Sequence, residues 1–317
     1  MENVSWNSHV LQLEGFSLSP GLSLVLWLSL LLCFVFVLIA NSVVVCAVFS
    51  DRRLHTPMYL LFCNLAINDM VANANILPRV LLDMLRPPSQ RLISYPECVF
   101  QAFTGHLLAT GVRMILMVMA FDRYLAVCLP LRYASVMTHR TLVKLLVLGW
   151  TVALVLVSVL LGLTVRLSRC RLLVVGLYCS NAALFGLSCE SVLVNNVYGL
   201  TFTAALYVSS AGSMVLTYGS IAAVSRRRGC APNRKALRTC PSHLLVYALS
   251  LFSGMTSIIF TRFPELRQER LLANVLYMAI PGCLNPLIYG LQSQELRTCA
   301  RAVFRRCTCP SAAAVRK

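Results

Sequence analysis

The sequence predicts an all-α bundle of seven membrane-spanning helices, and three observations carry that prediction. Hydrophobic residues make up 58% of the chain and charged residues 12%, with a mean hydropathy of +0.75, which is too apolar for a soluble protein surface. The apolar residues gather in seven runs, each long enough to cross a bilayer. The basic residues, which give a net charge of +17, lie in short tracts between these runs, a pattern that favours a membrane face over nucleic-acid binding.

The distribution of lysine and arginine predicts the orientation of the chain. Seven spans place the two termini on opposite sides of the membrane. Of the 28 basic residues, 18 lie in or beside the segments of one side and 8 in those of the other. The positive-inside rule makes the richer side cytoplasmic. We therefore expect an extracellular amino terminus (1–21), a seven-helix domain (22–291) and a cytoplasmic amphipathic helix with its tail (292–317).

The seven predicted spans begin and end at recognisable positions. They cover residues 22–49, 57–85, 98–128, 142–163, 194–224, 237–261 and 270–291. Pro57 opens the second span, where a proline costs no helical hydrogen bond, and Pro130 ends the third and leads into a loop. Pro286 predicts a kink in the seventh. After this span, apolar residues on one side and arginines on the other predict a short helix on the inner membrane surface.

Modifiable residues lie on both predicted sides. Asn3 is in the only glycosylation sequon, Asn3-Val4-Ser5, on the outer side, so we expect a glycan there. Cys299, Cys307 and Cys309 in the tail are candidates for palmitoylation.

Polar side chains inside the spans need partners. Asp69 lies near the middle of the second span, where an isolated charge is costly, and Asn41 and Asn285 are its natural partners. Arg79 and Asp83, four residues apart, predict a local ion pair.

The third span carries a polar face. His106, Thr110 and Arg113 recur at helical spacing, so they line a cavity or contact another helix. Arg113 has no acidic residue nearby in sequence, and two interpretations stay open: a functional role, or structural pairing inside the bundle.

The stretch Met119–Tyr133, MAFDRYLAVCLPLRY, places Asp122, Arg123 and Tyr124 at the end of the third span. Charges at the end of a membrane helix are usually anchors that reach for lipid headgroups. The alternative is a switch, in which the carboxylate holds the arginine in a closed state and opening frees it for a partner.

The cysteines and the remaining motifs limit the chemistry. Cys98, Cys170, Cys179 and Cys189 fall on the predicted outer side, where disulfides form, and the count alone allows three pairings. The sequence has no nucleophile elbow, no pairing of histidine with carboxylate and no metal-ligand spacing. We therefore expect no enzyme activity, no cofactor and no metal.

Taken together, the motifs resemble those of rhodopsin-like G-protein-coupled receptors over nearly the whole chain, and within that class those of odorant receptors, closest to the receptors of fish. The resemblance rests on PMYLLFCNLAINDM, MAFDRYLAVCLPLRY, KALRTCPSHL and LNPLIYGLQSQELR, together with three cysteines in one outer loop. It implies that Cys98 pairs with Cys179 and Cys170 with Cys189. It also implies a polar core that contains Asn41 and Asp69.

The resemblance further implies a switch at the inner ends of the helices. Arg123 would meet the G protein once the sixth span swings outward. The implied switch residues are Asp122, Arg123, Tyr124, Tyr218, His243, Asn285, Pro286 and Tyr289. The implied partners are a small-molecule odorant, the stimulatory olfactory G protein and membrane lipid, with no nucleic acid. The implied location is the plasma membrane of olfactory cilia.

Ligand contacts are implied only by position, because the pocket of this family varies between members. They lie in the outer halves of the third, fifth, sixth and seventh spans: His106, Ala109, Thr110, Phe202, Thr203, Leu206, Leu251, Met255, Val275 and Met278. Arg113 departs from the family, which mostly has an apolar residue there.

Two other functions are compatible with a bundle of seven spans. The first is a receptor of the same architecture for an endogenous ligand, although residues 98–119 lack the acidic residue that a cationic amine would need. The second is a transporter or channel, which predicts internal repeats, broken helices or a ring of charges, and the sequence has no such repeat.

Overall fold

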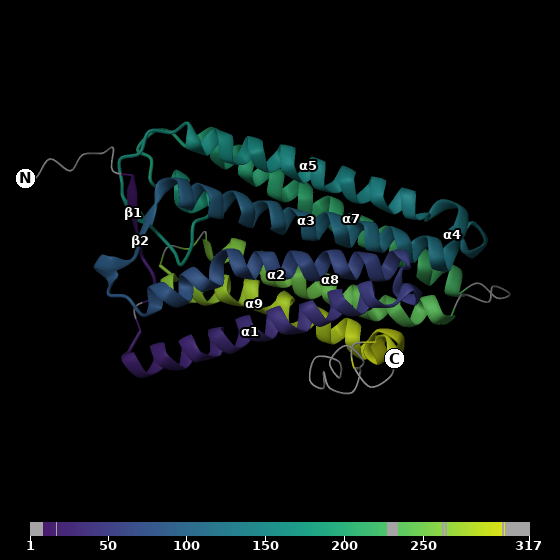
Figure 1. The fold of residues 1–317 in the computed structure, drawn as a ribbon. Helices are drawn as coiled ribbons and strands as arrows, with labels where there is room; N and C mark the ends of the chain where they lie inside the picture. Colours follow the sequence, from purple (N-terminus) through teal and green to yellow (C-terminus); the bar gives the residue numbers. More distant parts are fainter. Residues whose placement is uncertain are drawn as a thin grey trace, which may run out of the picture.

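The computed structural model is an elongated bundle of long helices with a small sheet at one end (Figure 1). It describes residues 9–16, 18–226, 234–261, 263, 265–299 and 301. The long helices are α1 (Pro20–Ser50), α2 (Pro57–Met84), α3 (Tyr95–Cys128), α5 (His139–Val165), α7 (Leu193–Arg226), α8 (Arg234–Thr261) and α9 (Arg267–Gln292). Among the described residues, seven helices are long and apolar enough to cross a membrane. The predicted seven-span, all-α architecture is confirmed, and every helix end lies within three residues of its predicted position.

Local sequence signals explain where these helices begin. Proline occupies the first turn of α1, α2 and α3, where its missing N–H has no intrahelical partner to lose. Ser94 and Glu97 form a reciprocal capping box at the start of α3. The Thr138 hydroxyl accepts a hydrogen bond from the Thr141 amide and caps α5 in the same way.

A three-stranded sheet closes one end of the bundle, called the sheet end below. Its central strand β1 (Val10–Leu13) is antiparallel to β2 (Leu92–Ser94) and parallel to β3 (Leu173–Val174). The short 3-10 helix η2 (Pro88–Gln90) precedes β2, and α6 (Asn181–Phe185) follows β3. The sequence predicted none of these strands, because runs of two to four residues carry no readable alternation.

The opposite end of the bundle, called the α4 end, carries η1 (Arg52–Leu54) and α4 (Pro130–Val136), as Figure 1 shows. The expectation of a loop after Pro130 is wrong. Pro130 occupies the first turn of α4, and the Met137 amide closes that helix on the Tyr133 carbonyl. A proline that ends one helix is also suited to begin the next.

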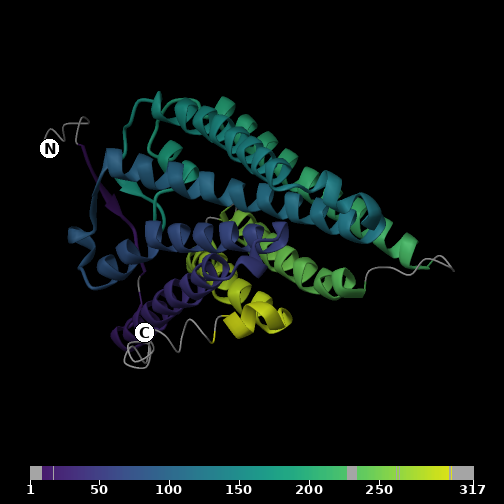
Figure 2. The same ribbon diagram turned by 45° about the vertical axis from the view of Figure 1, so that its right-hand side comes forward.

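The helices pack around α3, which contacts α2, α5, α7 and α8 (Figure 2). Gly111 of α3 lets α5 approach closely, since a Cβ at that position would lie 2.5 Å from the Trp150 ring. Large apolar side chains remain exposed along the outside of the bundle, for example Leu32 at 69% and Leu216 at 73%. Such a surface is stable only where lipid is the solvent.

A break at Ser293 separates α9 from a further helical segment, residues 294–299. The Ser293 hydroxyl accepts a hydrogen bond from the Leu296 amide at 3.0 Å, and Leu296 is buried against the bundle core. The described residues therefore contain the start of the predicted helix after the seventh span. Asn3, Cys307 and Cys309 lie outside the described residues, and the predicted domain limits stay predictions.

Candidate functional site

A buried polar cluster joins α1, α2 and α9 in the middle of the bundle. Asn285 donates a hydrogen bond to the Asp69 carboxylate at 2.8 Å, and both residues are almost fully buried. Asn41, the other predicted partner, instead donates to the Gly282 carbonyl at 3.0 Å. The cluster therefore satisfies the Asp69 side chain through α9 and ties α1 to the same helix. Pro286, which follows Asn285 in the chain, is also buried.

Asp122 and Arg123 form a buried pair at the α4 end. The Arg123 Nε donates to the Asp122 carboxylate at 3.0 Å, and the Arg123 Nη2 contacts the same oxygen. The Tyr133 hydroxyl donates to the second carboxylate oxygen at 2.8 Å. Burial, followed by the Asp122 charge, raises the pKa of the Tyr133 phenol, so that Tyr133 keeps its proton as the donor. Asp122 and Arg123 are 1% and 6% exposed, which favours the switch interpretation over headgroup anchors.

The other residues that the resemblance assigns to the switch make the following contacts. The Tyr218 hydroxyl of α7 lies 2.7 Å from the His243 Nδ1 of α8. His243 lines a small cavity together with Asp122 and Arg123. Tyr289 of α9 stacks on Phe62 with ring centres 3.8 Å apart. Tyr124 is only partly buried. The structure thus brings Asp122, Arg123 and His243 to one cavity, and Tyr218 and Tyr289 each contact a residue that lines it, His243 and Phe62 respectively.

The residues expected to contact ligand do not form a single cluster. On α3, the His106 Nε2 accepts a hydrogen bond from the Asn181 amide at 3.2 Å, and Thr110 donates to the His106 carbonyl. Phe202 packs with the residues of the sheet end, and Leu251 packs with the core near the α4 end. Val275 and Met278 pack against α1 and α2. Met255 is 41% exposed, and the other three positions are partly buried: Ala109, Thr203 and Leu206.

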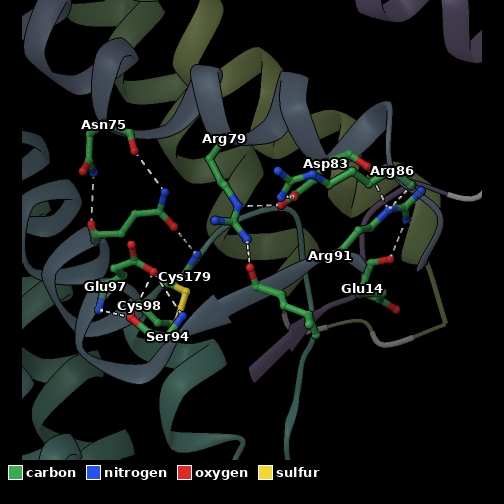
Figure 3. A network of polar contacts seen from close by, with 12 residues as sticks. Glu14, Asn75, Arg79, Asp83, Arg86, Arg91, Ser94, Glu97, Cys98 and Cys179 are labelled. Atoms are coloured by element: carbon green, nitrogen blue, oxygen red, sulfur yellow. Dashed lines mark hydrogen bonds and ion pairs between the residues drawn. A yellow bond between two sulfur atoms is a disulfide. The ribbon is translucent and has the colours of Figure 1, made fainter. Parts of the chain in front are cut away.

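Two disulfides hold the loop between α5 and α7. The structure pairs Cys98 with Cys179, with Cα atoms 5.2 Å apart, and Cys170 with Cys189, as the resemblance implied. Gln101 supports the first bridge, because its side-chain oxygen accepts from the Cys179 amide at 2.9 Å. Figure 3 shows the disulfide and Asn75 in this network. The loop is therefore fixed to the start of α3.

Arginines complete the cap at the sheet end (Figure 3). Arg79 and Asp83 form the predicted ion pair at 2.8 Å, which is confirmed. Arg91, which the sequence did not single out, is 8% exposed. Its Nη1 donates to the carbonyls of Glu14 and Phe16 at 3.0 and 3.2 Å. No sequence signal could identify these acceptors, because carbonyl groups occur at every residue.

Arg113 is buried between three helices without a carboxylate. Its Nη2 donates to the Tyr207 hydroxyl of α7 at 3.0 Å and to the Ser250 carbonyl of α8 at 2.7 Å. The guanidinium lies 4.5 Å from the centre of the Tyr207 ring. In the described part of the chain no ion pair reaches Arg113. Arg113 therefore has structural partners on two helices, and these are a phenol and a backbone carbonyl instead of a carboxylate.

Comparison with known proteins gives one consistent result. The profile of the olfactory receptor family matches residues 30–306. Mouse olfactory receptor 2A7 is 30% identical over 298 residues, which cover 92% of this chain and 94% of the relative. Human olfactory receptor 2C3 is 32% identical over 317 residues, which cover 98% of this chain and 97% of the relative. Human olfactory receptor 10H1 is 32% identical over 298 residues, which cover 92% of this chain and 92% of the relative. These three relatives are mammalian receptors.

Proposed function

Because this chain belongs to the olfactory receptor family, and is a multi-pass odorant receptor and not an enzyme, we propose how it binds its odorant and signals. The odorant binds in the half of the bundle nearer the sheet end. The α4 end then couples to a heterotrimeric G protein of the stimulatory olfactory type, which raises cyclic AMP. The receptor acts in the plasma membrane of olfactory cilia.

The proposed orientation places the sheet end outside the cell. Two disulfides lie at this end, and disulfides persist in oxidising compartments. Arg52, Arg53 and Arg132 lie at the α4 end, and the positive-inside rule favours the cytoplasm for such residues. The amino terminus, with the sequon at Asn3, is then extracellular.

The proposed ligand residues are those of α3, α7, α8 and α9 named above. His106 and Thr110 supply polar contacts, and Phe202 and Leu206 supply apolar ones. An odorant that binds the open conformation more tightly than the closed one shifts the population toward it, whereas equal affinity for both conformations would produce no signal.

The observation that carries the proposal is the buried pair of Asp122 and Arg123 beside the link from Tyr218 to His243. The pair keeps the arginine inside the bundle. The link joins α7 to α8, so an outward movement of α8 must break it. Opening would expose Arg123 to the G protein, with Tyr218 and Tyr289 steadying the open state. These contacts supply the two discrete arrangements that a switch needs.

Cyclic AMP output from cells that express the receptor with the olfactory G protein tests this proposal. We expect a dose-dependent rise with at least one member of a broad panel of water-soluble odorants. Arg123→Ala abolishes the response, because the residue that meets the G protein is gone. Arg52→Ala, which removes an exposed arginine at the same end, preserves it. A response that survives Arg123→Ala would contradict the role of Arg123, and silence to the whole panel at normal surface expression would favour an endogenous ligand.

A further inference from the structure

Arg113 of α3 is a buried cation for which the described chain supplies no counter-charge. The residue is 3% exposed, and the ion pairs of the structure all involve other arginines. Asp69, the acidic residue in the interior of α2, is already bonded to Asn285. A cation held away from water without an anion is unfavourable, so an anion that reaches it gains a strong interaction.

The Arg113 guanidinium keeps one nitrogen available in a defined place. Nη2 is held by the Ser250 carbonyl and the Tyr207 hydroxyl. Nη1 is also buried, yet it has no hydrogen-bond partner among the described residues. A buried donor without an acceptor is costly, and a ligand oxygen would remove that cost. Nη1 is therefore a positioned donor that the described residues do not use.

Arg113 lies at the inner limit of the region proposed to bind odorant. Helical spacing places Ala109 and Thr110 one turn from it, and His106 two turns from it, toward the sheet end. Side chains of a helix lean toward its amino terminus, which for α3 is the sheet end. Gly254 of α8 makes room for the guanidinium, since a Cβ there would lie 2.9 Å from Nη2.

We propose that the odorant of this receptor is a small carboxylic acid, bound with its carboxylate at Nη1 of Arg113. The proposal rests on the proposed function and names the ligand class of that same site. One carboxylate neutralises one guanidinium, and one of its oxygens can accept the charge-assisted hydrogen bond that Nη1 leaves unmade. A phosphate would bring a second charge into apolar surroundings, which favours the carboxylate. The hydrocarbon tail would extend from Arg113 toward the sheet end, where Phe202 packs.

The test compares straight-chain acids, from butanoic to decanoic, with the primary alcohol of the same length, in the cyclic AMP assay and with surface expression measured. We expect the acids to be more potent than the alcohols. Arg113→Gln keeps a hydrogen-bonding side chain but removes the charge, and we expect it to lower the potency of the acids by about tenfold or more while the alcohols change little. Arg113→Lys keeps the charge, and we expect it to retain the preference for acids. Arg171→Gln, at an exposed loop position, is the matched control.

Each contrary result has a distinct meaning. Equal losses for acids and alcohols in Arg113→Gln and Arg113→Lys would make Arg113 a clamp between helices and overturn the proposal. Responses to neutral odorants alone would overturn the carboxylate but leave the receptor function in place. If the response to alcohols required chloride in the medium, and Arg113→Gln removed that requirement, the site would bind a mineral anion. That result would also overturn the carboxylate proposal. Silence to every acid and alcohol, beside a response to another odorant of the broad panel, would overturn the ligand class alone, whereas silence to the whole panel would count against the proposed function.

Discussion

Removing the Arg91 guanidinium is expected to release β1 from the sheet end of the bundle. Arg91→Met keeps most of the aliphatic volume but deletes the donors. Nη1 bridges the carbonyls of Glu14 and Phe16, which directly follow β1, whereas Nε bonds the carbonyls of Asp83 and Arg86 at the end of α2. Of the bonds that the Arg91 side chain makes, those of Nη1 are the ones that reach the β1 segment. A hydrogen bond from a charged group is worth about 1.5–3 kcal/mol net, so the local opening equilibrium of β1 rises about 10- to 150-fold.

Hydrogen exchange of the receptor in lipid nanodiscs measures this opening directly. The Glu14 and Gly15 amides bond to the carbonyls of Val174 and Gly176, so their exchange reports the separation of β1 from its neighbour. We expect Arg91→Met to accelerate exchange in the peptide 10–16 by about 10- to 100-fold. The upper limit is below the about 150-fold rise in the opening equilibrium, because water can replace the guanidinium as a donor to the two carbonyls. Arg171→Met, which deletes an exposed arginine of the same end, is the control. Exchange unchanged within about threefold would refute the assigned role of Arg91.

Two further predictions concern stability. Cys98→Ser opens a bridge of sequence separation 81 and Cys170→Ser one of 19, so chain entropy predicts losses of unfolding free energy of at most about 4.5 and 3 kcal/mol respectively. We therefore expect the larger drop in the thermal stability of the purified receptor for Cys98→Ser. The reverse order would contradict the entropic reasoning. Gly111→Ala forces a Cβ against the Trp150 ring and lowers stability by about 1–3 kcal/mol, which thermal unfolding measures. Trp150→Leu in the same chain is expected to recover part of that loss, and a double variant no better than Gly111→Ala alone would exclude the clash as its cause.

The spans could be predicted because lipid imposes a simple pattern on the sequence. A run of about 20 apolar residues has few structures open to it in a membrane, and proline at Pro57 or Pro130 fixes a helix start locally. The same local reading failed after Pro130, because the sequence shows where a helix ends more clearly than whether another begins. The strands of the sheet end depend on partners about 80 and 160 residues away, so their short runs carry no signal of their own.

Some contacts of the candidate site could likewise be predicted from the sequence, and others could not. Asn285 could be named as the partner of Asp69, because few polar residues lie deep in the spans and each needs a partner. Arg113 could be recognised as unusual, but not assigned, since its acceptors are a backbone carbonyl of α8 and a phenol of α7. The contacts of Arg91 are likewise with carbonyls. Residue identity predicts a side chain's need for a partner, whereas tertiary packing decides which group meets it.

The order of the strands in the sheet has a consequence for biosynthesis. β1 pairs with β3 from Gln12 to Leu173, and α1, α2, α3 and α5 lie between them in the chain. The ribosome makes β1 first, so the edge of β1 that pairs with β3 stays unpaired until the fourth long helix has been completed. Closing a contact of such length is slow compared with helix formation. The completed sheet therefore records that the first four helices have been assembled, and a nascent receptor that stalls before this point exposes an open strand that chaperones and degradation factors can bind.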